Sequence, residues 1–184
     1  MLRRILLLSF TLTIASQAQQ DVSELLEQRT VAQLAGYAAS FDGVLGVAAI
    51  DLTTGRAFSL HGDAVFPQAS SIKIPIMIEV FRAARAGRFK LDDKINLTQQ
   101  DLVAGGRIDR LLAKGPVTLT VRELVANMIE FSDNTATNKL IAMVGMASVN
   151  RLLDDLGLHK TRLQRIMLDS AAARRNEENI STPL

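Results

Sequence analysis

Gln68-Ala69-Ser70-Ser71-Ile72-Lys73-Ile74-Pro75 is the stretch around which the chain is organised. It predicts the start of a helix, where Ser70 and Lys73, at positions i and i+3, share a face and can come within hydrogen-bond reach. A serine is a weak nucleophile until a base takes its proton, and an adjacent amine held neutral by its surroundings can do this. Free backbone N–H groups in the first turn could hold a developing oxyanion. Alone, the spacing also fits a capping serine followed by a solvated lysine.

Composition narrows the classes of function. The chain has 184 residues, 48% hydrophobic and 22% charged, which is enough for one domain with a core. It has no cysteine, so disulfides and zinc–thiolate sites are excluded. His61 and His159 are far apart without ligand spacing around them, so we expect neither a metal nor another cofactor. An aromatic share of 4% argues against stacking platforms for single-stranded nucleic acid.

Residues 1–18 have the layout of a secretory signal peptide. Two arginines precede an apolar run from Ile5 to Ala15, and Ser16 and Ala18 occupy the small-residue positions of a cleavage site. The run is short for a membrane span, so we expect cleavage and a periplasmic or secreted protein without a stable membrane anchor. Cleavage removes two arginines and no acids, so the net charge of +2 falls to zero. We therefore expect no nucleic-acid partner.

Hydrophobic patterning predicts an α/β chain with one hairpin. The expected elements are a helix over residues 21–40, strands over 44–50 and 56–60, and helices over 71–85, from 121, from 134 and around 149–156. Thr120 and Glu123 have the spacing of a capping box at the start of one helix. Residues 90–115 look polar and irregular, and no strand is expected beyond the hairpin.

A second motif, Ser132-Asp133-Asn134, lies between two predicted helices. Serine, aspartate and asparagine all favour the N-cap position, so the motif fits a helix start. A cap needs only one such residue, however. Three in a row could also deliver a hydroxyl and an amide into a cleft.

Ser70-x-x-Lys73 and Ser132-Asp133-Asn134 together resemble the class A (serine) β-lactamase family, in the superfamily of β-lactamases and penicillin-binding proteins. The likeness runs from about Gly46 to the C-terminus and includes Phe66-Pro67-Gln68-Ala69, residues 118–130 and Thr161-Arg162-Leu163-x-Arg165. It implies a β-lactamase/transpeptidase-like fold, a helical lobe plus an antiparallel sheet of which only the N-terminal hairpin is present. It also implies that residues 19–184 form the catalytic domain of a monomer without a cofactor.

The resemblance implies a role for each matching residue. Ser70 would attack the carbonyl of a small-molecule β-lactam and become acylated, and its backbone N–H would be half of the oxyanion hole. Lys73 would help to remove the serine proton, and Ser132 would pass a proton to the lactam nitrogen. Asn134 would bind the substrate's side-chain amide and help to hold Lys73. Asp133 would point inward and hold the loop.

This chain departs from the family pattern at two points. The family's catalytic glutamate, which activates the deacylating water, would stand at Met167, which cannot act as a base. Asp169, Glu177 and Glu178 lie nearby in the sequence, without a sign that any reaches the site. No Lys-Thr-Gly motif occurs, although the family places one on a later strand that binds the substrate carboxylate. We therefore expect a chain that lacks the C-terminal third, with an exposed hairpin edge and apolar sheet face.

Three interpretations follow. The first is a serine β-lactamase that hydrolyses the β-lactam amide and gives antibiotic resistance. The second is a penicillin-binding DD-peptidase, which stays acylated by penicillin, and the missing glutamate favours it. The single-domain layout and the stretch Thr161–Arg165 favour the first more strongly. The third, motivated by the missing motif, is a non-catalytic remnant of the fold or a binding module.

Overall fold

The computed structural model describes residues 22–184, which form two compact units. The first contains the described residues up to Ala64 together with Thr182–Leu184, and the second is Val65–Ser181. The predicted signal peptide, residues 1–18, lies outside the described residues. No helix within the described part of the chain is long and apolar enough to cross a membrane.

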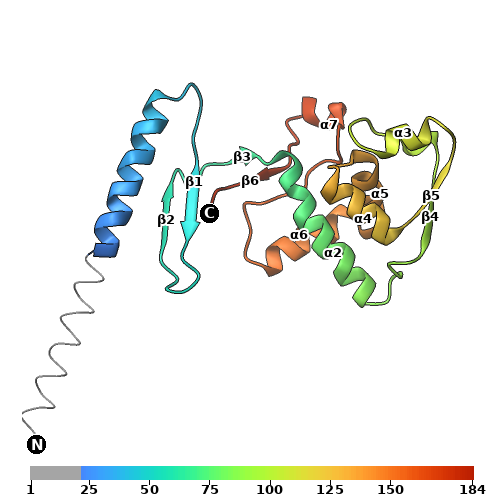
Figure 1. Ribbon diagram of the computed structural model, residues 1–184, viewed down its shortest axis with the longest axis horizontal. Helices are drawn as coiled ribbons and strands as arrows, with labels where there is room; N and C mark the ends of the chain where they lie inside the picture. Colours follow the sequence, from blue (N-terminus) through green and yellow to red (C-terminus); the bar gives the residue numbers. More distant parts are fainter. Residues whose placement is uncertain (1–21) are drawn as a thin grey trace, which may run out of the picture. The chain divides into compact units, whose positions relative to one another are not determined.

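The first unit is a helix and a hairpin (Figure 1). Residues 22–40 are helical, and strands β1 (Val47–Ile50) and β2 (Ala57–Leu60) pair antiparallel. The prediction of a hairpin is confirmed, with strands a few residues shorter than expected. Asp51 organises the turn, since its carboxylate accepts from the Thr53 N–H at 2.8 Å and the Thr54 hydroxyl at 2.6 Å.

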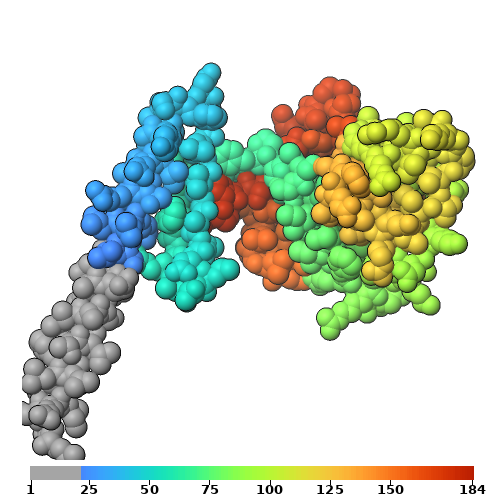
Figure 2. All heavy atoms as spheres, in the orientation of Figure 1, coloured from blue at the N-terminus to red at the C-terminus, as the bar shows by residue number. Residues whose placement is uncertain are grey.

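The second unit is mainly helical. Its helices are α2 (Lys73–Arg85), α3 (Ile108–Leu112), α4 (Val121–Glu130), α5 (Asn134–Val144), α6 (Met146–Asp155) and α7 (Ser170–Arg174). Helix α2 packs against α4, α5 and α6, and Figure 2 shows the atoms of α2 and α5 in contact on the face in view. The core between these helices includes Ile76, Leu124, Met128 and Leu140, each without exposed surface.

Helix α4 shows how local signals and packing agree. The Thr120 hydroxyl accepts from the Glu123 N–H at 3.2 Å, and the Glu123 carboxylate accepts from the Thr120 N–H at 2.7 Å. The predicted capping box is confirmed. Val121, Leu124 and Met128, spaced at i, i+3 and i+7, are buried on the face towards the core. The sequence of α4 therefore specifies both its start and its buried face.

The expectation of no strand beyond the hairpin is wrong. Strand β4 (Lys94–Leu97) pairs antiparallel with β5 (Val117–Thr120), and β3 (Phe66–Pro67) pairs with β6 (Ile180–Ser181). These strands have two to four residues each, too few for a clear period-2 pattern. Leu97 is fully buried while its neighbours are polar, and it pairs with Val117, twenty positions later, so its strand depends on a distant partner.

Candidate active site

The Ser70 segment begins α2 in two steps. Residues Ala69–Ile72 form a 3-10 helix, η1, and α2 continues from Lys73, which confirms the predicted helix start. Pro75 is the third residue of α2, where a backbone N–H would have no partner within the helix. Ala69 has φ +46°, an uncommon conformation for a residue with a side chain. The Ser70 N–H therefore lies in the first turn, where it can donate to a ligand.

The Ser132-Asp133-Asn134 segment begins α5. Asp133 is fully buried, and its carboxylate accepts from the Ala136 N–H at 2.9 Å and the Ile108 N–H at 2.7 Å. The expectation that Asp133 points inward is confirmed. Ser132 has φ +51°, so a second non-glycine residue at the site has left-handed backbone. Asp133 therefore caps α5, and Ser132, the left-handed residue before the cap, has its hydroxyl directed towards Ser70 in η1.

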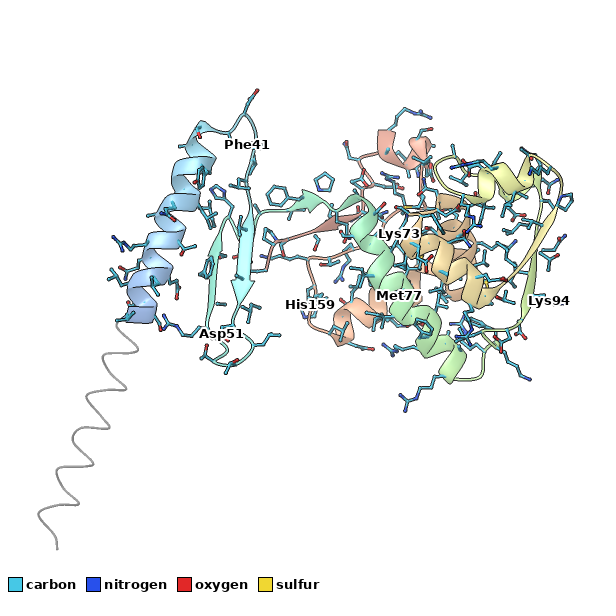
Figure 3. The ribbon with its side chains drawn as sticks, viewed as in Figure 1. Phe41, Asp51, Lys73, Met77, Lys94 and His159 are labelled. Carbon is cyan, nitrogen blue, oxygen red and sulfur yellow. The ribbon has the colours of Figure 1, made fainter. Side chains whose placement is uncertain are left out.

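Four residues singled out from the sequence lie together. Lys73 Nζ donates to Ser132 O at 2.6 Å, to Ser132 Oγ at 2.9 Å and to Asn134 Oδ1 at 3.1 Å. Ser132 Oγ donates to Ser70 Oγ at 3.0 Å. Figure 3 shows Lys73 at the N-terminal end of α2. Among the described residues no hydrogen bond joins Lys73 directly to Ser70, because Ser132 lies between them.

Two opposing influences act on the pKa of Lys73. Its side chain is 2% exposed, and this burial lowers the pKa of the ammonium, while the nearby Asp133 carboxylate acts in the opposite direction. Its three hydrogen bonds use all three protons of the charged form. Because burial lowers the pKa, the neutral amine is available nearer to physiological pH than for a solvated lysine, as a general base needs.

The loop before α3 supports Asn134. The Asn134 amide donates from Nδ2 to Ala104 O at 2.8 Å while its oxygen accepts from Lys73. A Cβ atom at Gly105 would lie 2.9 Å from Asn134 Nδ2, and one at Gly106 would overlap the Asp133 carboxylate. Only glycines allow this loop to approach the site so closely.

Met167 is held beside α5 by Asn138. Asn138 Oδ1 accepts from the Met167 N–H at 2.7 Å, and Nδ2 donates to Met167 O at 3.1 Å. The Met167 side chain is buried and belongs to the hydrophobic core. Met167, which stands where the family pattern has a glutamate, is therefore held by two backbone hydrogen bonds and has an apolar, buried side chain. Sequence reasoning missed Asn138, whose only signal is an amide among the apolar residues of α5.

The three acids near Met167 are engaged elsewhere. Glu178 accepts from Arg165 Nε at 3.1 Å and from Nη2 at 2.8 Å, and this ion pair lowers the pKa of Glu178. Glu177 pairs with Arg175 at 2.8 Å. Asp169 caps α7 by accepting from the Ala172 N–H at 2.9 Å. Within the described part of the chain, none of the three has a hydrogen bond to Ser70, Lys73 or Ser132.

Comparisons with known proteins identify the family and the fold. A family model described as the β-lactamase enzyme family matches residues 28–184. A β-lactamase of Sphaerobacter thermophilus DSM 20745 is 38% identical, with a TM-score of 0.72 over 83% of this chain and 56% of that one. A class A β-lactamase representing the last common ancestor of Gram-negative bacteria is 33% identical, with a TM-score of 0.73 over 83% of this chain and 58% of that one.

A third solved structure, described as PBP-A, is 27% identical, with a TM-score of 0.70 over 85% of this chain and 57% of that one. The chain thus spans between 56% and 58% of the length of these three structures. The expected fold class, with helices and small antiparallel strand pairs, is confirmed by the likeness. The chain belongs to the β-lactamase enzyme family.

Proposed function

We propose that Ser70 attacks the carbonyl of a β-lactam amide and becomes acylated. The observation that carries this proposal is the continuous hydrogen-bonded series from Lys73 Nζ through Ser132 Oγ to Ser70 Oγ, with steps of 2.9 and 3.0 Å. A nucleophile, a relay hydroxyl and a buried amine of lowered pKa are the groups that acyl transfer to serine requires.

The proton movements follow from this series. When Lys73 is neutral, the hydrogen bonds reverse, so that Ser70 donates to Ser132 and Ser132 donates to Lys73. As Ser70 Oγ bonds to the carbonyl carbon, its proton moves to Ser132 and the Ser132 proton moves to Lys73. The Ser70 N–H stabilises the oxyanion. When the carbon–nitrogen bond breaks, Ser132 gives a proton to the leaving nitrogen and regains one from Lys73.

Asn134 has two tasks in this scheme. Its Oδ1 holds Lys73, and the Nδ2 group, anchored to Ala104 O, faces the loop where the acyl side chain of a substrate would bind. We propose that this amide binds the amide of that side chain. Asp133 holds the loop and does not touch the reacting atoms.

Acylation is faster than deacylation in this proposal. Hydrolysis of the acyl-enzyme needs an activated water, and the buried Met167 side chain offers no base for it. Asp169, Glu177 and Glu178 all have other partners. The chain therefore acts as a serine β-lactamase with slow turnover, and resistance to an antibiotic would rest on binding and slow hydrolysis. Export to the periplasm or beyond, and a monomeric state, remain predictions.

A specific observation favours a second candidate, a penicillin-binding DD-peptidase. Met167 stands where class A enzymes have their glutamate, and one of the similar structures is PBP-A. The third interpretation, a non-catalytic remnant, predicts no acylation at all. Because the chain spans little more than half of its relatives' length, the activity of a whole relative is a proposal here.

Intact-mass measurements over time, after mixing the purified chain with benzylpenicillin, separate these candidates. We expect a one-to-one adduct that is absent in Ser70→Ala and decays slowly. An adduct that decays within seconds would mean that another group activates water. An adduct that persists for days would favour the DD-peptidase. No adduct on a chain shown to be folded would overturn the proposal of acylation.

A further inference from the structure

Helix α5 has two buried threonines that use their hydroxyls differently. Thr137 donates to Asp133 O, four positions earlier, at 2.6 Å, as a threonine within a helix commonly does. Thr135, which is 1% exposed, bonds outside the helix. Its Oγ1 accepts from the Val103 N–H at 2.9 Å and donates to Val103 O at 3.0 Å. The Thr135 hydroxyl therefore joins α5 to a segment that precedes it by about thirty residues.

The two hydrogen bonds hold the backbone of Val103 as a paired strand would. A hydroxyl has one proton to donate and lone pairs with which to accept. Thr135 uses both functions on one residue, so the N–H and the C=O of Val103 are satisfied together. Because threonine is branched at Cβ, few side-chain rotamers are open to it in a helix. The position of α5 therefore determines the position of Val103.

The segment that Thr135 holds has no regular secondary structure of its own. Residues 102–107 are neither helix nor strand. Lys139 lies one turn after Thr135 on the same face of α5, and its Nζ donates to Asp101 Oδ1 at 2.9 Å. Two side chains of α5 thus determine the path of the segment, since its own backbone forms neither a helix nor a strand.

The residue after Val103 orients the side chain of Asn134. Ala104 O accepts from Asn134 Nδ2 at 2.8 Å, and the Asn134 N–H donates to Gly105 O at 3.4 Å. The other end of the amide, Asn134 Oδ1, accepts from Lys73 at 3.1 Å. Because Val103 directly precedes Ala104, a displacement of Val103 would also move the carbonyl that holds the Asn134 amide.

We propose that Thr135 is a positioning residue for the binding of the substrate's acyl side chain. Its hydroxyl fixes Val103, and the carbonyl of the adjoining Ala104 then orients the Asn134 amide. The inference rests on the proposed function, in which Asn134 binds the amide of that side chain. Thr135 itself touches neither the substrate nor the reacting atoms. Loss of its hydroxyl should therefore weaken binding of the acyl side chain and leave the rest of the substrate bound as before.

Binding can be measured without acylation in the Ser70→Ala chain. The probes are benzylpenicillin and 6-aminopenicillanic acid, which has the same ring system but a free amine in place of the side-chain amide, titrated by ligand-observed NMR. Thr135→Val has nearly the same shape and leaves Val103 without its hydroxyl partner. We expect this change to lower the preference for benzylpenicillin about threefold to tenfold, as for one lost hydrogen bond. Binding of 6-aminopenicillanic acid should not change.

Two further variants in the same background separate the hydroxyl from shape and stability. Thr135→Ser keeps the hydroxyl and should keep the preference. Thr137→Val is the matched control, because it removes an equally buried hydroxyl whose bond does not reach the segment, so it should lower stability without changing the preference. Hydrogen exchange of peptides covering residues 98–106 should be faster in Thr135→Val alone. Circular dichroism shows whether each variant is folded.

A preference that survives Thr135→Val would overturn the inference, and so would an equal loss in Thr137→Val or in Thr135→Ser. Equal binding of the two probes by the Ser70→Ala chain would also overturn it, because no side-chain contact would then exist to be positioned. Intact-mass measurements test the proposed function separately. A preference that depends on Thr135, in a chain whose Ser70 never forms an adduct, would leave the positioning role standing and remove the proposed acylation. Adducts together with a preference unaffected by Thr135→Val would have the opposite meaning.

Discussion

The two units of this chain differ in how they are held together. Among the described residues, the buried hydrophobic side chains of the core all lie in the second unit, between Ile72 and Ala172. In the first unit, large apolar side chains are more than half exposed, namely Val22, Leu25, Leu26, Tyr37, Phe41, Val44, Ile50 and Leu52. The proposed nucleophile, base and relay serine all belong to the unit with the core. The position of the catalytic groups therefore depends on the packing of α2, α4 and α5.

The strands show the same contrast. Within the described residues, β1 pairs only with β2, so both strands of the hairpin have an open edge. Open edges and exposed apolar side chains favour association between chains. The second unit uses its short strands differently, since Ile95, Val117 and Leu119 pack against the helical core. A short strand pair is thus stable where helices cover one of its faces.

Hydrogen exchange should show the largest difference between the units. Amides of α5, over a buried core, should exchange only on global unfolding, whereas those of β1 and β2 should exchange through local opening at far lower free energy. We expect at least about a thousandfold greater protection in α5. Exchange measured by mass spectrometry on peptides of both units tests this. Equal protection would show that the hairpin is stabilised as strongly as the core.

Truncating one leucine in each unit gives the next largest effect. Leu140 has no exposed surface, and Leu140→Ala should lower the free energy of unfolding by about 2–5 kcal/mol. Leu26 is 57% exposed, and Leu26→Ala should cost less than about 1 kcal/mol. Urea unfolding followed by circular dichroism compares them. Similar losses would mean that Leu26 is buried in solution.

The packed unit should also determine how the proposed acylation of Ser70 responds to pH. Burial lowers the pKa of Lys73, and the proposed base is its neutral amine, so the acylation rate should rise about tenfold per pH unit below that pKa and then level off. The plateau should begin below the pKa of a solvated lysine, about 10.4. Stopped-flow acylation across pH measures the profile. A rate that is flat from pH 5 to 9 would exclude Lys73 as the titrating base.

Asn138→Ala tests whether the segment around Met167 depends on its hydrogen bonds to α5. The change leaves the Met167 N–H and C=O without their partners, and buried groups of this kind cost about 1–3 kcal/mol each. We expect lower stability and faster proteolysis within residues 161–179. The control is Asn127→Ala, which removes an amide hydrogen bond to Glu123 O at 2.7 Å within α4 and does not touch residues 161–179. Faster cleavage in the control alone would contradict the assignment.

The smallest effect concerns two threonines. Thr120→Ala removes the capping box of α4 and should cost about 1 kcal/mol, because α4 contributes to the core. Thr54→Ala removes a hydroxyl bond to Asp51 in the exposed hairpin turn, and we expect less than about 0.5 kcal/mol. Thermal unfolding of both variants gives the comparison. A larger loss for Thr54→Ala would reverse the ranking of the units.

Local patterns predicted much of this structure. The capping box at Thr120, the hairpin around Asp51 and the helix after Ser70 depend on neighbouring residues, and all were predictable. Ser70, Lys73, Ser132 and Asn134 lie together as the motifs indicated. The expected contact between Ser70 and Lys73 is replaced by hydrogen bonds through Ser132. The orientation of Ser132 depends on its left-handed backbone, which no sequence pattern reveals.

Features that join distant segments were not predictable from one sequence. Strand β4 pairs with β5, and β3 pairs with β6, from distant parts of the sequence. Each strand is too short to have a local pattern that identifies it. The Asn138 amide reaches Met167 across 29 positions of the chain. Each of these depends on tertiary packing.

The left-handed backbone of Ala69 has a consequence for protein engineering. Glycine adopts a φ of +46° without strain, whereas alanine there costs about 1–3 kcal/mol. An Ala69→Gly chain would therefore gain stability in the folded state, offset in part by the greater freedom of glycine in the unfolded state. The same freedom would let Ser70 sample more orientations. Selection for thermal stability alone at residue 69 would therefore favour glycine and make the orientation of Ser70, the proposed nucleophile, less well defined.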